Sequence, residues 1–531
     1  MHDSPSAAAS SDRPAVPARM LLAVWLVAAI LRLLHNQAML ADPLYFNPLG
    51  GNLPYLLAAE SISGGDLVPF DGPISLNSPL YPYLLAGLYE LLGTNAFYGV
   101  RVVTGLLDAG TCALVAHLAW RHFGPVAGWA GGMALALYGP LIFFAADLNP
   151  VPFTLFFLTS ALLVLDRAER PRGHLAAGLL FGLTAATRPN VLLAGLAALL
   201  VPWVRRTPKP AVAMIALAVG LGLGVAPITT LNVAASGEPV LLTTGAGHNF
   251  YIGHNPEAEA QYSLPASLDG DIFASMKALA EDVEGRPFDE TEVSGWYLRR
   301  ALAHMAANPA RELELLGRRA LLLVNDFEAT TYANFEYQRA YSAILRWSPT
   351  FLLLFTLAAP GMLRCLTRER LHLWIPFLTA AATVLAFFYI ARLRVVMVPS
   401  LGIFAGAGVA TIVAGVRNRA WRRLTPSLAV AVVAAGMAAL PLLRSDTSNE
   451  WNKAGGVLRM AGEMDGAEAA FERAGQENPS NPNVWLNLAS LYEATGRAQA
   501  ADTARARAEA LLARGGMDAN AYRRALEAGP P

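Results

Sequence analysis

Long apolar runs separated by short polar connectors make up most of the chain, and two long polar segments interrupt them. A helix that spans a bilayer needs about 20 mainly apolar residues. Runs that reach or approach this length predict about eleven transmembrane helices, at residues 19–36, 99–120, 125–145, 150–166, 174–187, 190–204, 210–232, 349–364, 372–391, 395–415 and 425–443. The pattern predicts an α-helical polytopic membrane protein.

The stretch 174–204 has two interpretations, because two short apolar runs meet at Arg188-Pro189-Asn190. It forms either two spans or one long bent helix, and a single helix would reverse the direction of every later span. The basic connectors at 364–370 and 417–423 favour two spans.

Arginine and lysine gather in the short connectors between the apolar runs. These residues are Arg121, Arg167, Arg170, Arg172, Arg205, Arg206, Lys209, Arg364, Arg368, Arg370, Arg417, Arg419, Arg422 and Arg423. Short loops rich in basic residues stay in the cytoplasm. If successive spans alternate in direction from a cytoplasmic N-terminus, all of these connectors lie on the cytoplasmic side. Both long polar segments are then predicted on the extracytoplasmic side.

Three parts are expected in the chain. Residues 1–18, rich in Ala, Ser and Pro, are predicted to be a disordered cytoplasmic tail. Residues 19–445 form the membrane domain, with outer loops at about 37–98 and 234–347. Residues 446–531 form a helical tail, which the count of eleven spans places in the periplasm if the membrane is the inner membrane of a bacterial envelope.

The outer loops contain helical patterns of their own. Residues 79–92 are apolar but too short to span a bilayer, and their prolines and tyrosines suit a helix lying in the interface. Asp289 or Thr291 is expected to cap a helix in the second loop, and a further helix is predicted at 310–323.

A period of 34 residues marks the tail. Trp451 and Trp485 are 34 residues apart, and so are Gly462 and Gly496. This period, with Trp, Gly and Ala at fixed places, is typical of the tetratricopeptide repeat. The tail is therefore predicted to form two helical hairpins that either bind a protein partner or simply cap the chain.

Composition supports the membrane class. The chain has 531 residues, of which 54% are hydrophobic and 15% charged, against roughly 25% charged residues in soluble domains. Its net charge is zero, so nothing indicates a nucleic-acid partner.

Four arginines are expected near the outer face of the membrane domain: Arg101, Arg188, Arg392 and Arg394. Charged residues at membrane depth are costly and mark functional sites by default. Guanidinium groups bind phosphate in a bidentate manner, so these residues are predicted to bind a lipid-linked phosphate. The alternative is snorkelling of their side chains toward lipid headgroups.

Carboxylates on the same face are candidates for a general base or for ligands of a divalent metal. Asp147, Asp66 and Asp71 are the predicted catalytic residues, and Asp42 lies on the same face. No cofactor is certain from the sequence, and loop solvation or helix capping is the alternative for each carboxylate. Asp108 lies inside the second span and is interpreted as structural, with Thr104 and Thr111 as its expected partners.

The stretch 242–257 combines glycine, asparagine, histidine and aromatic residues, a mixture that suits sugar binding. His248 and Asn249 are its predicted substrate-binding residues. His248 and His254 alone give only a weak indication of metal.

Four segments carry a resemblance to a known family. They are Ser78-Pro-Leu-Tyr-Pro-Tyr-Leu-Leu, Ala177-Gly-Leu-Leu-Phe-Gly-Leu-Thr-Ala-Ala-Thr-Arg-Pro-Asn, Ser236-Gly-Glu-Pro-Val through Gly253-His-Asn-Pro, and Phe388-Tyr-Ile-Ala-Arg-Leu-Arg with Pro399. The chain resembles the multi-pass GT-C glycosyltransferases related to protein O-mannosyltransferases and aminoarabinose transferase. The resemblance implies a polyprenyl-phosphate sugar donor and transfer of the sugar outside the cytoplasm.

One departure from the family concerns the first outer loop. The family has an acidic residue a few positions before a tyrosine, whereas this chain has Gly51-Asn52 before Tyr55. Asn52 cannot accept a proton as a carboxylate does, so the acid is either missing or supplied by Asp42, Asp66 or Asp71. Asn52 and Tyr55 are the predicted substrate-binding residues of this loop. Asp147 matches the second acidic position of the family.

These features of the sequence are compatible with three functions. The first is a glycosyltransferase that moves a sugar from a polyprenyl-phosphate donor to a protein, lipid or glycan acceptor. The second is a degenerate relative that binds a lipid-linked glycan and recruits partners through its tail. The third is a transporter, against which the large one-sided loops and the lack of an evident inverted repeat argue.

Overall fold

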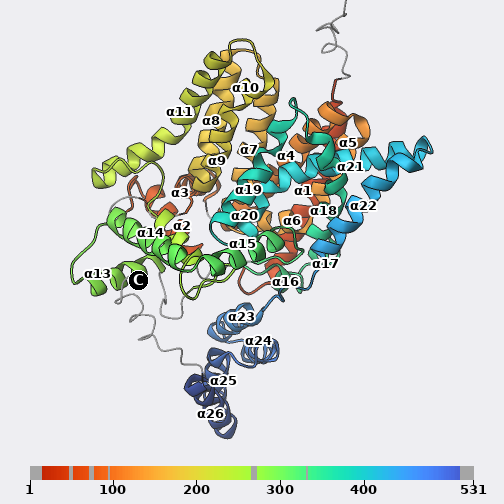
Figure 1. The fold of residues 1–531 in the computed structure, drawn as a ribbon. Coiled ribbons are helices and arrows are strands. Elements are labelled where there is room, and N and C mark those ends of the chain that lie inside the picture. The colour runs from red at the N-terminus through yellow and green to blue at the C-terminus, as the bar shows by residue number, and fades with distance from the viewer. Residues whose placement is uncertain are drawn as a thin grey trace, which may run out of the picture.

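The computed structural model describes residues 15–46, 52–70, 74, 77–93, 96–264, 272–329 and 333–514. These residues form a bundle of helices, a layer of shorter helices at one end of it, and a small helical tail beyond that layer (Figure 1). Three predicted features lie outside the described residues: the first fourteen residues, Gly51 and Asp71.

Every predicted apolar run coincides with helical structure. The bundle consists of α1 (Ala18–Ala38), α4 (Ala96–Phe123), α5 (Pro125–Leu137), α6 (Gly139–Ala146), α7 (Val151–Arg167), α8 (Pro171–Thr187), α9 (Leu192–Leu199), α10 (Val201–Arg205), α11 (Pro210–Ser236), α18 (Phe351–Met362), α19 (Ile375–Ala386), α20 (Ala391–Arg394), α21 (Val398–Arg417) and α22 (Trp421–Ala438). Within the described residues, four segments are long and apolar enough to cross a membrane, and the bent pair α5–α6 is a fifth. The others are shorter, so the predicted count of eleven spans is not confirmed.

The chain reverses direction at Arg188. The helix α8 begins after Arg170 and ends at Thr187, and α10 ends at Arg205. The Arg205 guanidinium donates to Asp166 at the end of α7 over 2.7 Å, so α10 returns to the end of the bundle at which α8 began. Residues 174–204 therefore form two antiparallel segments, as the basic connectors indicated, and not one bent helix.

The basic connectors meet around one carboxylate. Asp166 accepts hydrogen bonds from Arg121 (2.6 Å) and Arg205, and it lies 3.1 Å from both His122 and His372. Four connectors distant in sequence thus lie at one end of the bundle, the end that the charge pattern predicts to be cytoplasmic.

The loop layer at the opposite end contains α2 (Leu53–Ser63), α3 (Tyr81–Leu92), α12 (Ala246–Gly253), α13 (Ile272–Glu284), α14 (Glu290–Ala307), α15 (Pro309–Leu323), α16 (Phe335–Gln338) and α17 (Ala343–Trp347). Asp289, rather than Thr291, caps α14, in a reciprocal pair with Glu292. Arg319 of α15 donates to the carbonyl oxygens of Gly253 (2.5 Å) and Leu385 (3.2 Å), which ties the loop layer to the end of α19.

The tail forms two helical hairpins, α23 (Ser448–Met460) with α24 (Met464–Glu477) and α25 (Pro482–Ala494) with α26 (Ala498–Arg514). Gly462 and Gly496 occupy equivalent turns with φ of +83° and +75°, a backbone region that favours glycine. This explains why the two glycines recur after 34 residues. The tail lies on the same side of the bundle as the loop layer (Figure 1).

A buried ion pair joins the first helices of the bundle. Arg32 of α1 and Asp108 of α4 lie 2.7 Å apart, and each is only 1% exposed. Arg32 also donates to the carbonyl oxygens of Ala136 (2.7 Å) and Leu135 (3.3 Å), at the bend between α5 and α6. Asp108 is therefore structural, as expected, but its partner is Arg32 and not the neighbouring threonines.

Replacing Arg32 is expected to destabilise the fold strongly. Arg32→Met leaves a buried carboxylate and two helix-end carbonyls without their donor, which costs about 3–5 kcal/mol. The matched control is Arg318→Met, which breaks an ion pair with Glu314 whose side chains are 63% and 45% exposed and which costs less than about 1 kcal/mol. Thermal unfolding of both variants in detergent measures the difference, and equal melting temperatures would contradict this prediction.

Candidate functional site

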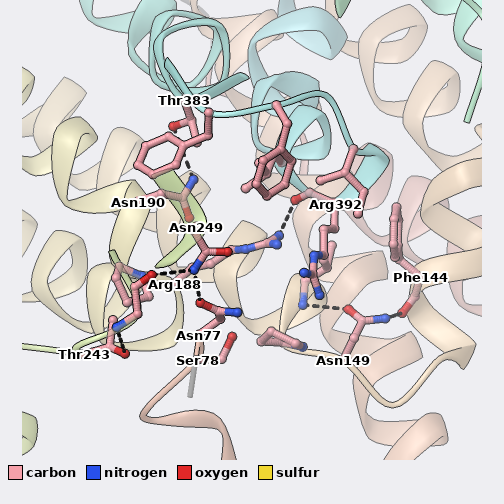
Figure 2. A pocket seen from close by; sticks show the side chains of 18 of the residues that line it. Asn77, Ser78, Phe144, Asn149, Arg188, Asn190, Thr243, Asn249, Thr383 and Arg392 are labelled. Carbon is pink, nitrogen blue, oxygen red and sulfur yellow. Dashed lines mark hydrogen bonds between the residues drawn. The ribbon is translucent and has the colours of Figure 1, made fainter. Parts of the chain in front are cut away.

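A cavity of about 380 Å³ lies between the bundle and the loop layer. Three chain breaks meet there: the connection from α6 to α7, the turn from α8 into α9, and the irregular segment between α19 and α20. Figure 2 shows Asn149 of the first break, Arg188 of the second and Arg392, just after the third, around the cavity. The predicted residues that line it are Asn52, Tyr55, Asp147, Arg188, Asn249 and Arg392.

Proline fixes two of these breaks. A residue that precedes proline avoids the helical region and adopts extended backbone. Arg188 precedes Pro189, and its φ of −155° and ψ of 99° end α8 and direct the chain into the cavity wall. Pro150 occupies the N-cap of α7, and the side-chain oxygen of Asn149 accepts from the backbone amide of Val151 over 2.8 Å. The sequence thus places a charged or amide side chain at each helix end.

The third break is held by the loop layer. The backbone amide of Tyr389 donates to the carbonyl of Ala260 over 2.8 Å, and the amide of Tyr262 donates to the carbonyl of Tyr389 over 3.0 Å. The amide of Ala391 donates to the carbonyl of Ala329 over 2.7 Å. These hydrogen bonds pair backbone groups that have no partner within a helix. They also fix the position of the segment that precedes Arg392.

Asp147 lies between α6 and α7 with amides on both sides. Its carboxylate accepts from the side-chain nitrogens of Asn149 at 3.0 Å and Asn52 at 3.2 Å. Burial raises the pKa of the Asp147 carboxyl above its usual range, while these amides and the nearby charge of Arg101 lower it in part. A carboxylate with a raised pKa is suited to taking up a proton.

Arg188 and Arg392 form the cationic part of the cavity. The Arg188 guanidinium donates to the carbonyl oxygen of Arg392, which brings the two breaks together. Beside them, Leu193 and Leu196 of α9 line the cavity and are also 45% and 47% exposed on the surface of the bundle. The cavity therefore combines two guanidinium groups with an apolar wall that reaches the outer surface of the bundle.

The remaining polar lining consists of amides and hydroxyls. Asn249 donates to the side-chain oxygen of Asn77 at 2.9 Å and to the carbonyl of Gly245 at 2.7 Å (Figure 2). Ser78 and Thr243 line the cavity near this pair. Sequence reasoning missed Asn77, Asn149, Asn190, Thr243 and Thr383, although the adjacent motifs Asn149-Pro150 and Pro189-Asn190 offered a signal for two of them.

Three predicted residues are used elsewhere. Arg101 donates to the carbonyl oxygens of Tyr45 (2.7 Å), Ala146 (2.9 Å) and Phe97 (2.9 Å). Arg394 is ion-paired with Glu328 and lies 3.9 Å from the centre of the Phe351 ring. His248 is buried among aromatic rings, 5.2 Å from Phe273 and 5.5 Å from Tyr297. The structure does not bring these three residues to the cavity.

Asp66 also lies away from the cavity. It is exposed and accepts hydrogen bonds from the backbone amide of Val68 (3.1 Å) and the hydroxyl of Ser61 (3.3 Å), within a local turn. Its surroundings fit loop solvation rather than contact with the site.

A smaller polar chamber of about 60 Å³ adjoins the cavity and shares Asn52 and Asp147 with it. Asp42 and Arg101 line it from the membrane domain, and Glu450 lines it from the first tail helix. Burial raises the pKa of Asp42 to about 6 and that of Glu450 to about 7. The tail is thus part of the wall beside Asp147.

An aromatic contact holds the tail in this position. The Trp451 ring lies 4.8 Å from the Tyr337 ring and 5.9 Å from the Tyr341 ring of the loop layer. The Tyr337 hydroxyl donates to Asp42 over 2.9 Å. Tyr337 thus links the tail, through its contact with Trp451, to Asp42 in the wall of the chamber.

One group of side chains among the described residues has the arrangement of metal ligands. His122, Asp166 and His372 offer ligand atoms within 4.8 Å of one another. The Arg205 guanidinium lies 2.7 Å from Asp166 and 3.1 Å from His372. Its fixed positive charge therefore already neutralises the Asp166 carboxylate without a metal ion. This cluster lies at the opposite end of the bundle from the cavity.

The fold and the cavity define a multi-pass helical membrane protein with a site beneath its loop layer. Residues 73–228 match the family model described as dolichyl-phosphate-mannose-protein mannosyltransferase, and residues 458–528 match the tetratricopeptide repeat. These matches confirm the predicted resemblance to the GT-C glycosyltransferases with a tetratricopeptide-repeat tail. The first match contains Asp147 and Arg188.

A curated relative is the lipid A galacturonosyltransferase RgtD of Rhizobium johnstonii, 26% identical over 232 residues. The alignment covers 41% of this chain, and the chain spans about half (48%) of that relative. Among solved structures, ArnT from Cupriavidus metallidurans bound to undecaprenyl phosphate is 15% identical, with a TM-score of 0.37 over 76% of this chain and 80% of that chain. The Archaeoglobus fulgidus oligosaccharyltransferase is 14% identical, with a TM-score of 0.38 over 84% of this chain and 56% of that chain.

Replacing Tyr337 is expected to release the tail. Tyr337→Ala removes a buried ring that packs on Trp451, together with the hydrogen bond to Asp42. The loss of a buried aromatic side chain costs about 3–5 kcal/mol, so cleavage in the linker 439–447 by a protease should become at least about 10-fold faster. The control is Tyr492→Ala in the tail, whose ring contacts Arg497 rather than the loop layer. Equal cleavage rates in the two variants would show that Tyr337 does not hold the tail.

Proposed function

We propose that this protein is an integral membrane glycosyltransferase that transfers a sugar from a polyprenyl-phosphate donor to an acceptor at the face that carries the loop layer. The observation that supports this most strongly is the convergence of Asp147, Arg188 and Arg392 in one cavity with an apolar side wall. The match to a mannosyltransferase family, and a relative named as a lipid A glycosyltransferase, support the same class of reaction.

The cavity offers the two chemical functions that this reaction needs. Asp147 takes the proton from the acceptor hydroxyl as its oxygen attacks the anomeric carbon of the sugar. The bond between that carbon and the phosphate oxygen breaks, and Arg188 and Arg392 stabilise the negative charge on the leaving lipid phosphate. Attack opposite the leaving group inverts the anomeric centre.

The apolar wall fits the lipid part of the donor. Leu193 and Leu196 connect the cavity with the lipid-facing surface of α9, so a polyprenyl chain can stay in the bilayer while its phosphate reaches the guanidinium groups. The two arginines lie at the cavity end of their helices, where a phosphate at the outer leaflet would arrive.

Asn52 acquires a role in this proposal despite the missing acid. Its amide donates to Asp147, so it orients the base rather than acting as a second one. Among the described carboxylates, Asp147 is then the one proposed to act on the acceptor, and Asp66 is left out of the proposed chemistry.

The tail provides a second element of the proposal. Its repeats suit a protein partner, and the position of its first helix beside the site supports a location on the same side of the membrane as the loop layer. The second candidate function is that of a catalytically inactive relative that recruits partners through this tail. Asn52, which stands where the family has an acidic residue, favours this alternative.

Turnover in proteoliposomes tests the proposal. The protein is given a panel of polyprenyl-phosphate sugars with envelope extract as acceptor, and release of polyprenyl phosphate is followed. Asp147→Asn is expected to lower the rate by about 100-fold or more, the usual contribution of a general base. Arg188→Ala or Arg392→Ala should lower it by about 100- to 1000-fold, whereas the exposed Arg318→Ala should leave it unchanged. Tight donor binding without release by the unaltered protein would favour the degenerate relative.

The pH dependence of the rate tests Asp147 as the base. A base must be ionised, so the rate falls as the pH drops through the raised pKa of Asp147. Asn52→Ala removes a hydrogen bond that lowers this pKa, and the acid limb of kcat/KM should therefore move to higher pH. Asn190→Ala is the control, because Asn190 lines the cavity but donates to Thr383. An acid limb that stays in place in Asn52→Ala would argue against Asp147 as the titrating group.

A further inference from the structure

We infer that the donor sugar is neutral, a hexose or pentose without a carboxylate or an amino group. This inference rests on the proposed function and deepens it by naming the chemical class of the transferred group. It is supported by the charged residues of the cavity and by the pair of side-chain amides, Asn77 and Asn249, at its polar wall.

The charged groups that line the cavity are few. Within the described part of the chain they are Asp147, Arg188 and Arg392, and every other polar lining residue is an amide or a hydroxyl. The neutral polar residues are Asn52, Tyr55, Asn77, Ser78, Asn149, Asn190, Thr243, Asn249 and Thr383.

The reaction itself uses all three charges. The phosphate of the donor carries one negative charge, and the released polyprenyl phosphate carries up to two, so the two guanidinium groups balance the leaving group. Asp147 is required to receive the proton of the acceptor. No cation in the described lining is left for a sugar carboxylate, and no carboxylate is left for a sugar ammonium group.

The amide pair offers what neutral hydroxyls need. The amide nitrogen of Asn249 donates to Asn77 and to the Gly245 carbonyl, which uses both of its hydrogens and the Asn77 oxygen. The Asn249 oxygen and the Asn77 amide nitrogen then present one acceptor and one donor side by side. Two neighbouring sugar hydroxyls, each both a donor and an acceptor, match this arrangement.

A charged sugar would be penalised at this wall. Burying a charge away from water is costly unless a partner of opposite charge accompanies it. The chain therefore differs from its relative RgtD, whose name specifies galacturonate, a sugar with a carboxylate. The difference lies in the sugar and leaves the common reaction class unaffected.

A matched set of donors tests this inference. The galacturonate donor differs from polyprenyl-phosphate galactose only at C6, and the galactosamine donor differs from it only at C2. The glucose, mannose and arabinose donors extend the neutral class. Release of polyprenyl phosphate gives kcat/KM for each. At least one neutral donor is expected to exceed the galacturonate and galactosamine donors by about 100-fold or more. A charged donor used as well as the best neutral donor would overturn the inference and leave the proposed function standing. Consumption of none of the six would contradict the proposed function and the inference together.

A charge introduced at the amide pair provides a second test. Asn77→Lys places a cation beside the sugar and should shift the ratio of kcat/KM for galacturonate over galactose by at least about 10-fold toward galacturonate. This ratio is internal to each variant, so partial loss of folded protein does not affect it. Asn483→Lys, at an exposed position of tail helix α25, is the control and should keep the original ratio. An unchanged ratio in Asn77→Lys would show that the sugar does not lie against this pair.

Discussion

The buried pair of Arg32 and Asp108 is the interaction on which the site depends. A bend in a membrane helix frees carbonyl oxygens that lipid cannot satisfy. Arg32 donates to the carbonyls of Leu135 and Ala136 at the 53° bend between α5 and α6, and Asp108 balances its charge. The bend redirects α6, and Asp147 follows directly at its end. A polar contact deep in the bundle thus determines where the proposed base lies.

The same physical requirement divides the arginines of the outer face into two kinds. Arg101 and Arg394 donate to backbone carbonyls at interrupted helices, including those of Ala146 and Asn325. Arg188 and Arg392 instead lie where two interruptions face each other across the cavity. Arg188 also donates to a backbone carbonyl, that of Arg392, but Arg188 and Arg392 line the cavity and are the two arginines proposed to bind the donor phosphate.

The sequence was informative about the spans because apolar length and basic connectors are local signals. It also indicated Asp147, Arg188 and Arg392, since each stands at a helix end next to Pro, Asn or a short charged motif. It did not separate these residues from Arg101 and Arg394, because a buried charge is equally compatible with a structural and a ligand-binding role. Asn77 could not be found from the sequence, since its place beside Asn249 depends on contacts between segments about 170 residues apart.

The tail and the site share a wall, and this limits how independent the tail can be. Glu450 of α23 lines the chamber that also contains Asn52 and Asp147, and Trp451 beside it packs on Tyr337. A tail that only tethered a partner would need no contact with residues next to the base. The hydrogen bond from Tyr337 to Asp42 instead makes the position of the tail part of the surroundings of Asp147. Movement of the tail would change the charge and the solvent access beside the base, so the repeats and the proposed chemistry belong to one structural unit.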